Sequence, residues 1–104
     1  MYRVTTPEHT FTLPENISHY KVVQVAYKQG SNKLVKTYAN GTASSGMVVS
    51  GTNVVITLTQ EETKKFKKGE ASVQVRALTL ADRAVASAQF PFTIEDVNNE
   101  DILT

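Results

Sequence analysis

Residues 53–69, NVVITLTQEETKKFKKG, decide the fold class because an alternating strand runs directly into a short helix. Val54, Ile56 and Leu58 share one face of this segment, which is the two-residue period of a half-buried strand. A second alternating run begins at Ser72. A strand, a short helix and another strand in this order are typical of a chain that crosses between the two sheets of an antiparallel sandwich.

The predicted helix covers residues 60–67 and has a recognisable start. Thr59 and Glu62 have the spacing of a capping box, in which each side chain accepts a hydrogen bond from the other residue's backbone N–H. Phe66 is the only large apolar residue of this helix, so we expect it to anchor the helix in the core. The lysines of KKFKK, residues 64–68, then lie at the negative end of the helix dipole. We interpret them as a solvated helix end and not as a nucleic-acid-binding patch.

Alternation and turn residues predict about seven short strands in all, the count of an immunoglobulin-like antiparallel sandwich. The cysteine pair and core tryptophan of antibody domains are absent, so the prediction is for a sandwich and not for the antibody family. The expected strands cover residues 9–13, 20–29, 33–39, 47–49, 53–58, 71–79 and 84–94. Besides the residues named above, the expected core positions are Phe11, Leu13, Val23, Val25, Tyr27, Val73, Val75, Ala77, Ala86, Ala88, Phe90, Phe92 and Ile94.

The length of 104 residues fits one domain. We expect an N-terminal arm over residues 1–8, the sandwich over residues 9–94 and a C-terminal tail over residues 95–104. The net charge of +1 favours neither nucleic acid nor acidic lipid as a partner. No apolar run has the length of a membrane span, and the N-terminus lacks the pattern of a signal peptide, so we expect synthesis in the cytoplasm.

The sequence offers little catalytic chemistry. The absence of cysteine excludes disulfides, thiolate catalysis and cysteine-ligated zinc. His9 and His19 have no second histidine at ligand spacing. No serine lies in a Gly-x-Ser-x-Gly context, and residues 41–46 lack the Lys-Ser/Thr that closes a phosphate loop. We therefore expect neither an enzyme nor a bound metal or cofactor.

Two features are candidates for partner contact. The acidic, polar tail ends in the apolar pair Ile102 and Leu103, and is either a frayed terminus or a docking segment. Pro91 lies inside the last predicted strand, which must then be an edge strand or be broken there. The flanking Phe90 and Phe92 are candidate contacts for a strand added at that edge.

Several motifs resemble those of small structural proteins of phages and prophages of Gram-positive bacteria. They are the opening Thr-x-Phe-x-Leu-Pro segment at residues 10–14, the Leu-Thr-Gln-Glu-x-Thr-x-x-Phe segment at 58–66 and the Val-Gln-x-Arg strand at 73–76. The layout is also similar to the N-terminal β-sandwich domain of phage baseplate upper proteins.

The resemblance implies a non-enzymatic virion component, made in the host bacterial cytoplasm. It would bind other phage structural proteins of the tail, baseplate or capsid, with its own copies held as a homo-oligomer by symmetry. It implies no catalytic residues. The net charge and the lack of a long apolar run lead us to expect no nucleic-acid or membrane partner. The alternative is a free-standing carbohydrate- or cell-surface-binding module that uses tyrosines and polar loops.

Overall fold

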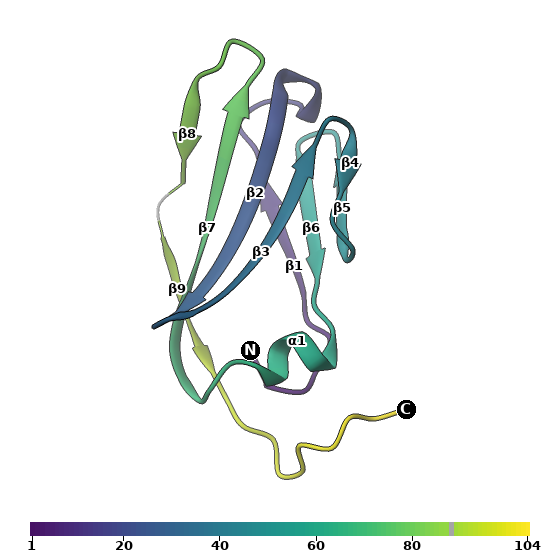
Figure 1. Cartoon of the computed structure of the whole chain (residues 1–104), viewed down its shortest axis with the longest axis vertical. Helices are drawn as coiled ribbons and strands as arrows, with labels where there is room; N and C mark the ends of the chain where they lie inside the picture. Colours follow the sequence, from purple (N-terminus) through teal and green to yellow (C-terminus); the bar gives the residue numbers. More distant parts are fainter. Residues whose placement is uncertain (88) are drawn as a thin grey trace.

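The chain is an antiparallel β-sandwich with one short α-helix (Figure 1). The structure is a computed structural model and describes residues 1–87 and 89–104. Its strands are β1 (Glu8–Thr12), β2 (Tyr20–Gln29), β3 (Asn32–Ala39), β4 (Thr42–Ala43), β5 (Met47–Ser50), β6 (Asn53–Thr57), β7 (Gly69–Thr79), β8 (Ala84–Ala86) and β9 (Phe90–Ile94). A 3-10 turn, η1 (Ile17–His19), precedes β2, and α1 (Gln60–Lys64) follows β6.

The two sheets differ in size. The smaller sheet has the order β1-β6-β5. The larger has the order β4-β3-β2-β7, and both β8 and β9 pair with the outer side of β7. The helix α1 joins β6 of the small sheet to β7 of the large one, so the predicted sandwich with a helical crossover is confirmed.

The pairing order allows the strands to be matched with those of an immunoglobulin sandwich, in which strands A, B, E and D face strands C, F and G. Here β1, β6 and β5 take the places of B, E and D, while β2 and β7 take the places of C and F. Both β8 and β9 share the place of G. In the part of the chain that the structure describes, no strand takes the place of A beside β1. The outer side of β1 is therefore a sheet edge.

The core and the helix cap follow the sequence prediction closely. Val54, Ile56 and Leu58 are fully buried, as the alternation required. The Thr59–Glu62 capping box is formed in both directions. The α-helix ends at Lys64, earlier than predicted, and Phe66 lies just beyond it with 2% of its surface exposed. Phe66 therefore anchors the turn that leaves the helix.

The prediction of one continuous strand over residues 84–94 is wrong. Residues 84–94 form two strands, β8 and β9, and Pro91 lies within the second of these edge strands. Ala86, expected in the core, is exposed, and Phe90 is 49% exposed. Ala86 is in register with the exposed Arg76 of β7 and therefore lies on the outer face of the sheet. Phe90 is in register with the buried Val73, but it lies at the edge of the sheet. The predicted core position Ala88 lies outside the described residues. With this division and the two-residue β4, the described residues form nine strands instead of about seven.

Candidate interaction surface

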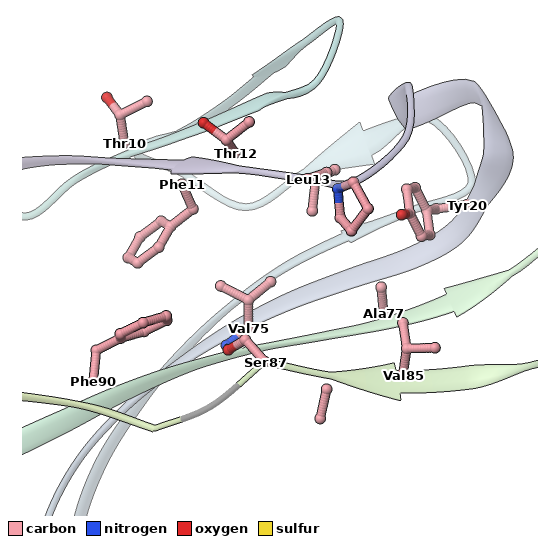
Figure 2. Close-up of a pocket in the computed structure, with 12 residues that line it drawn as sticks. Thr10, Phe11, Thr12, Leu13, Tyr20, Val75, Ala77, Val85, Ser87 and Phe90 are labelled. Atoms are coloured by element: carbon pink, nitrogen blue, oxygen red, sulfur yellow. The ribbon is translucent and has the colours of Figure 1, made fainter.

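An apolar pocket of about 500 Å³ opens between the two sheets, along β1 on one side and β8 and β9 on the other. Figure 2 shows the Phe11 ring from β1 and the Phe90 ring from β9 pointing toward one another across it. Thr10 and Thr12 point away from the pocket in the same view. The residues that line it are Thr10, Phe11, Thr12, Leu13, Pro14, Tyr20, Val75, Ala77, Val85, Ala86, Ser87 and Phe90.

The opposite side of the sandwich is closed by the chain itself. The backbone N–H of Met47, at the start of β5, donates to the carbonyl of Ser44 at 3.0 Å. Lys36 of β3 donates to the carbonyl of Ser45 at 2.8 Å. Both contacts lie in the short connection that runs from β4 of the large sheet to β5 of the small one and closes this side. The pocket thus lies on the one long side where a strand in the place of A would otherwise cover the core.

The N-terminal residues bind the other sheet's last strand and form no strand beside β1. Tyr2 forms a parallel bridge with Glu95, just after β9. The N–H of Arg3 donates to the Glu95 carbonyl at 2.8 Å, and the N–H of Glu95 donates to the Met1 carbonyl at 2.8 Å. Residues 1–3 of the predicted arm thus continue the edge of β9, and no strand of the described residues pairs with the outer edge of β1.

A second hollow of about 410 Å³ continues along the same side toward the N-terminus and is lined in part by His9, Tyr27 and Phe92. His9 Nδ1 lies 2.7 Å from the Tyr27 hydroxyl. Phe92 packs edge-on against the Tyr27 ring, with the ring centroids 6.2 Å apart. Burial, with a smaller contribution from the positive charge of the N-terminus, lowers the pKa of His9 below its ordinary value of 6.5. Burial also raises the pKa of Tyr27.

We call the continuous surface formed by the outer edge of β1 and these two hollows the seam. It brings together two of the predicted contact residues, because Phe90 and Phe92 both line it. Sequence reasoning identified the β9 side of the seam and missed β1. The sequence did contain a signal that the outer edge of β1 is unpaired, since no strand was predicted before residue 9 to pair with it.

The other two predicted contact residues lie elsewhere, at the end of the sandwich that carries α1 and both chain termini (Figure 1). Leu103 is 78% exposed and Ile102 is partly buried. Gln60 holds the tail there, since its side chain donates to the Leu103 carbonyl at 2.9 Å and accepts from the Leu103 N–H at 2.8 Å.

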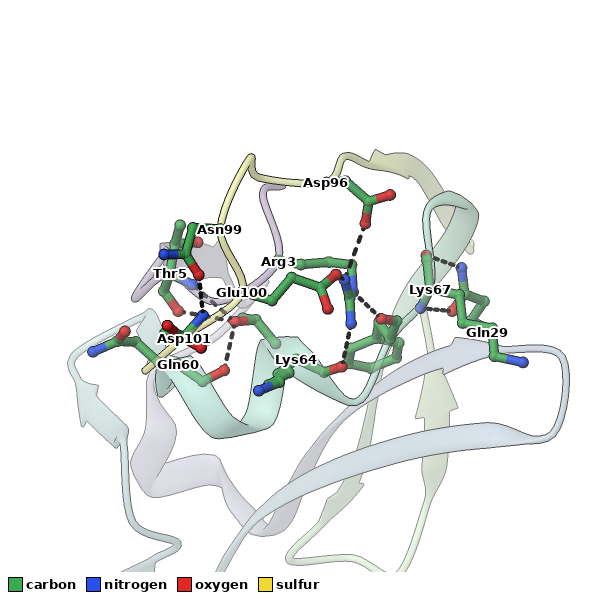
Figure 3. Close-up of polar contacts among 12 residues, drawn as sticks. Arg3, Thr5, Gln29, Gln60, Lys64, Lys67, Asp96, Asn99, Glu100 and Asp101 are labelled. Atoms are coloured by element: carbon green, nitrogen blue, oxygen red, sulfur yellow. Dashed lines mark hydrogen bonds and ion pairs between the residues drawn. The ribbon is translucent and has the colours of Figure 1, made fainter. Parts of the chain in front are cut away.

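Arg3 ties the tail to the helix end (Figure 3). Its guanidinium donates to the backbone carbonyl of Lys64, the last residue of the helix, and to that of Phe66 just beyond it. The same group pairs with Asp96 at 3.0 Å and with Glu100. The tail therefore lies against the domain, with the Leu103 side chain directed mostly to solvent.

An ion pair between a buried lysine and a partly buried glutamate links the large sheet to the helix. Lys36 Nζ of β3 lies 2.6 Å from a Glu62 carboxylate oxygen, and the two side chains are 9% and 17% exposed. Burial alone would raise the pKa of Glu62, but hydrogen bonds from Lys36 and Thr59, with the lysine's charge, lower it below its ordinary value. From the sequence, Glu62 was expected only in the capping box of the helix. Lys36 occupies an inward position of β3 that carries no distinguishing signal.

Among the described residues, no group of three or more His, Cys, Asp or Glu side chains could hold a metal ion. Over the same residues, no helix is long and apolar enough to cross a membrane. Compared with known proteins, the chain matches no family model, no curated protein and no solved structure.

Proposed function

We propose that this chain is a non-enzymatic structural protein of a phage particle, which assembles with other particle proteins of the tail, baseplate or capsid. The observation that carries the proposal is the seam, where an unpaired strand edge borders an apolar pocket. An exposed edge offers backbone donors and acceptors to another strand, and the adjacent pocket accepts its apolar side chains. This combination recognises protein chains.

The sequence motifs support the particle as the setting. The segments at residues 10–14 and 58–66 resemble those of phage structural proteins, and both now have structural roles. The first supplies most of β1 and the wall of the pocket. The second supplies the capped helix and its anchor, Phe66. A small rigid domain with a strand edge open to partners suits a subunit that is repeated by symmetry.

Immunogold electron microscopy on phage particles induced from the bacterium that encodes this chain tests the proposal. Label on the capsid, tail or baseplate of purified particles is the expected result, and its position identifies the partner proteins. Purified particles without label would overturn the proposal. Saturable binding of the isolated chain to cell-wall polysaccharide, in that case, would point to the carbohydrate-binding alternative.

A chain that ends at residue 96 tests whether the tail contributes to assembly. The contacts of the tail with Arg3 and Gln60 are exposed, so the truncated domain should fold with little loss of stability. If Ile102 and Leu103 dock on another particle protein, the truncated chain should be absent from purified particles. Loss of folding would show that the tail belongs to the core, and unchanged incorporation would exclude it as a docking segment.

A further inference from the structure

We infer that the outer edge of β1 binds the β1 strand of a second copy of this chain, antiparallel and about a two-fold axis at Thr10. The two small sheets would join into one continuous sheet of six strands. This deepens the proposed function by naming one partner of the seam, and rests on that function only for its place in a particle.

The backbone register shows which groups of β1 are free to bind a second strand. The carbonyl of Pro7 accepts from the N–H of Leu58, and the N–H of Leu13 donates to the carbonyl of Thr52. In an antiparallel pair, alternate residues direct their N–H and C=O to the same neighbour. The odd-numbered residues of β1 therefore bond to β6. Glu8, Thr10 and Thr12 direct their backbone groups outward.

Pairing about Thr10 uses all of these groups. Thr10 meets the second copy's Thr10, and Glu8 meets the second copy's Thr12. No like charges face each other, and opposed threonines are a favourable cross-strand pair. Glu8, Thr10 and Thr12 are all exposed, so their side chains do not obstruct the joint. The edge is thus complementary to itself, which a two-fold interface requires.

Apart from its short length and the charge of Glu8, the strand also lacks the devices by which natural proteins block an edge. Such edges carry lysine, proline or a bulge. The sequence of β1 is EHTFT, without lysine or proline, and its register with β6 is continuous. By contrast, β9 on the other side of the seam carries Pro91, which cannot donate to an added strand. The two edges differ in this respect, and β1 is the one suited to pairing.

The same geometry explains what would cover the pocket. Side chains alternate along a strand, so the second copy's His9 and Phe11 face the same side as their counterparts in the first copy. They then lie over the mouth of the pocket beside Phe11 and Phe90, and remove apolar surface from water. The second copy occupies the place that strand A takes in a complete immunoglobulin sandwich.

Single cysteines test both the pairing and its register, because the natural chain has no cysteine. In Thr10→Cys, the two opposed Cα atoms lie about 5.5 Å apart, within the range of a disulfide. In the matched control Thr12→Cys, the same residue type on the same face lies about 13 Å from its counterpart. With an added mild oxidant, we expect covalent dimers from the first variant and monomers from the second. Equal cross-linking of both variants, or of neither, would overturn the inference.

Charge variants provide a second test without cross-linking. Light scattering after size exclusion should give twice the chain mass for the natural protein, and the chain mass for Thr10→Lys, in which two lysines face each other. Mixing Thr10→Lys with Thr10→Glu should restore the dimer. Val48→Lys, at an exposed position on the far edge of the same sheet, should remain dimeric.

A natural chain that is monomeric throughout a dilution series, or a dimer that Thr10→Lys leaves intact, would overturn the inference. Circular dichroism of each variant verifies that the sandwich is folded. These outcomes are separate from those of particle labelling, because a monomeric chain can still be found in particles and a dimer can be absent from them.

Discussion

Replacing Lys36 by methionine would leave the Glu62 carboxylate buried beside an apolar side chain. Methionine retains the length and most of the packing of the lysine stem, so the change removes mainly the charge and the contacts of Nζ with Glu62 and with the Ser45 carbonyl. Removal of one partner from a buried ion pair costs about 3–5 kcal/mol in general. The surroundings of Glu62 lower the cost expected in this protein.

Two features limit the cost. Glu62 keeps the hydrogen bond that its carboxylate accepts from the Thr59 N–H at 2.9 Å. The carboxylate can also take up a proton instead of staying charged. For a group with an ordinary pKa of 4.5, protonation at pH 7 costs about 3.4 kcal/mol, from 1.36 kcal/mol per pH unit. A lost hydrogen bond to a charged group costs at least about 1.5 kcal/mol. We therefore expect the lost Glu62 contact in Lys36→Met to lower the free energy of unfolding by about 1.5–3.4 kcal/mol at pH 7. The lost hydrogen bond to the Ser45 carbonyl adds to this loss.

The loss should depend on pH in a defined direction. The pKa of Glu62 is lowered in the folded protein, so its contribution to stability is present above pH 4.5 and is lost as the pH falls through the lower folded pKa. In Lys36→Met this contribution is already gone. The difference between the two proteins should therefore shrink as the pH falls below 4.5.

Urea unfolding followed by tyrosine fluorescence measures these values, since the chain has four tyrosines and no tryptophan. Lys33→Met is the matched control, because Lys33 lies on the same strand with its side chain exposed, and it should change stability by less than about 0.5 kcal/mol. A loss below 1 kcal/mol for Lys36→Met, or a loss that does not vary with pH, would refute the reasoning. The Lys36–Glu62 pair would then contribute no more to stability than an exposed surface ion pair does.

Three further predictions concern single positions. Phe66→Ala should destabilise the fold by about 3–5 kcal/mol in the same urea assay, because the ring is buried beyond the helix end; a loss below about 1 kcal/mol would show that Phe66 is not an anchor. Gly46→Ala should destabilise the fold far more than Gly41→Ala, although both residues have positive φ. The reason is that only at Gly46 would the new Cβ lie 2.4 Å from the Thr57 carbonyl oxygen. Equal losses of stability would show that the positive φ alone sets the cost. His9 has a lowered pKa, so stability should begin to fall as the pH drops below 6.5, and a pH titration of His9→Gln should lack that decline; an unchanged profile in the variant would attribute it to another group.

Alternation along the chain was enough to predict the sandwich and most of its core. The inward positions of β2 and β6, such as Val25 and Ile56, are apolar at every second residue and are fully buried. Each of those strands has a neighbour on both sides, so its pattern reflects one stable environment. The capping box was equally predictable because its two residues interact within a single turn.

The failures occurred where burial depends on a distant partner. In the sequence, Lys36 looks like an ordinary surface lysine. Its inward position is stabilised by the ion pair with Glu62, which belongs to another element. Phe90 reads as a core residue, yet the strand that would cover it is absent from the described part of the chain. The seam itself is a property of pairing order. Local residue patterns predict that a strand exists, and they contain little information about the strand beside it.

The pairing order also governs how this chain can fold as it is synthesised. The hairpin of β2 and β3 can form as soon as its residues leave the ribosome, because its strands are consecutive. Strand β1 must wait for β6, and β2 gains its second neighbour only when β7 emerges. Such non-local pairing slows folding and leaves apolar edges exposed meanwhile. During that interval, neighbouring nascent chains on one messenger RNA would expose Phe11 and its unpaired strand to each other. Aggregation at high expression should therefore depend on translation rate and temperature more than on the stability of the finished domain.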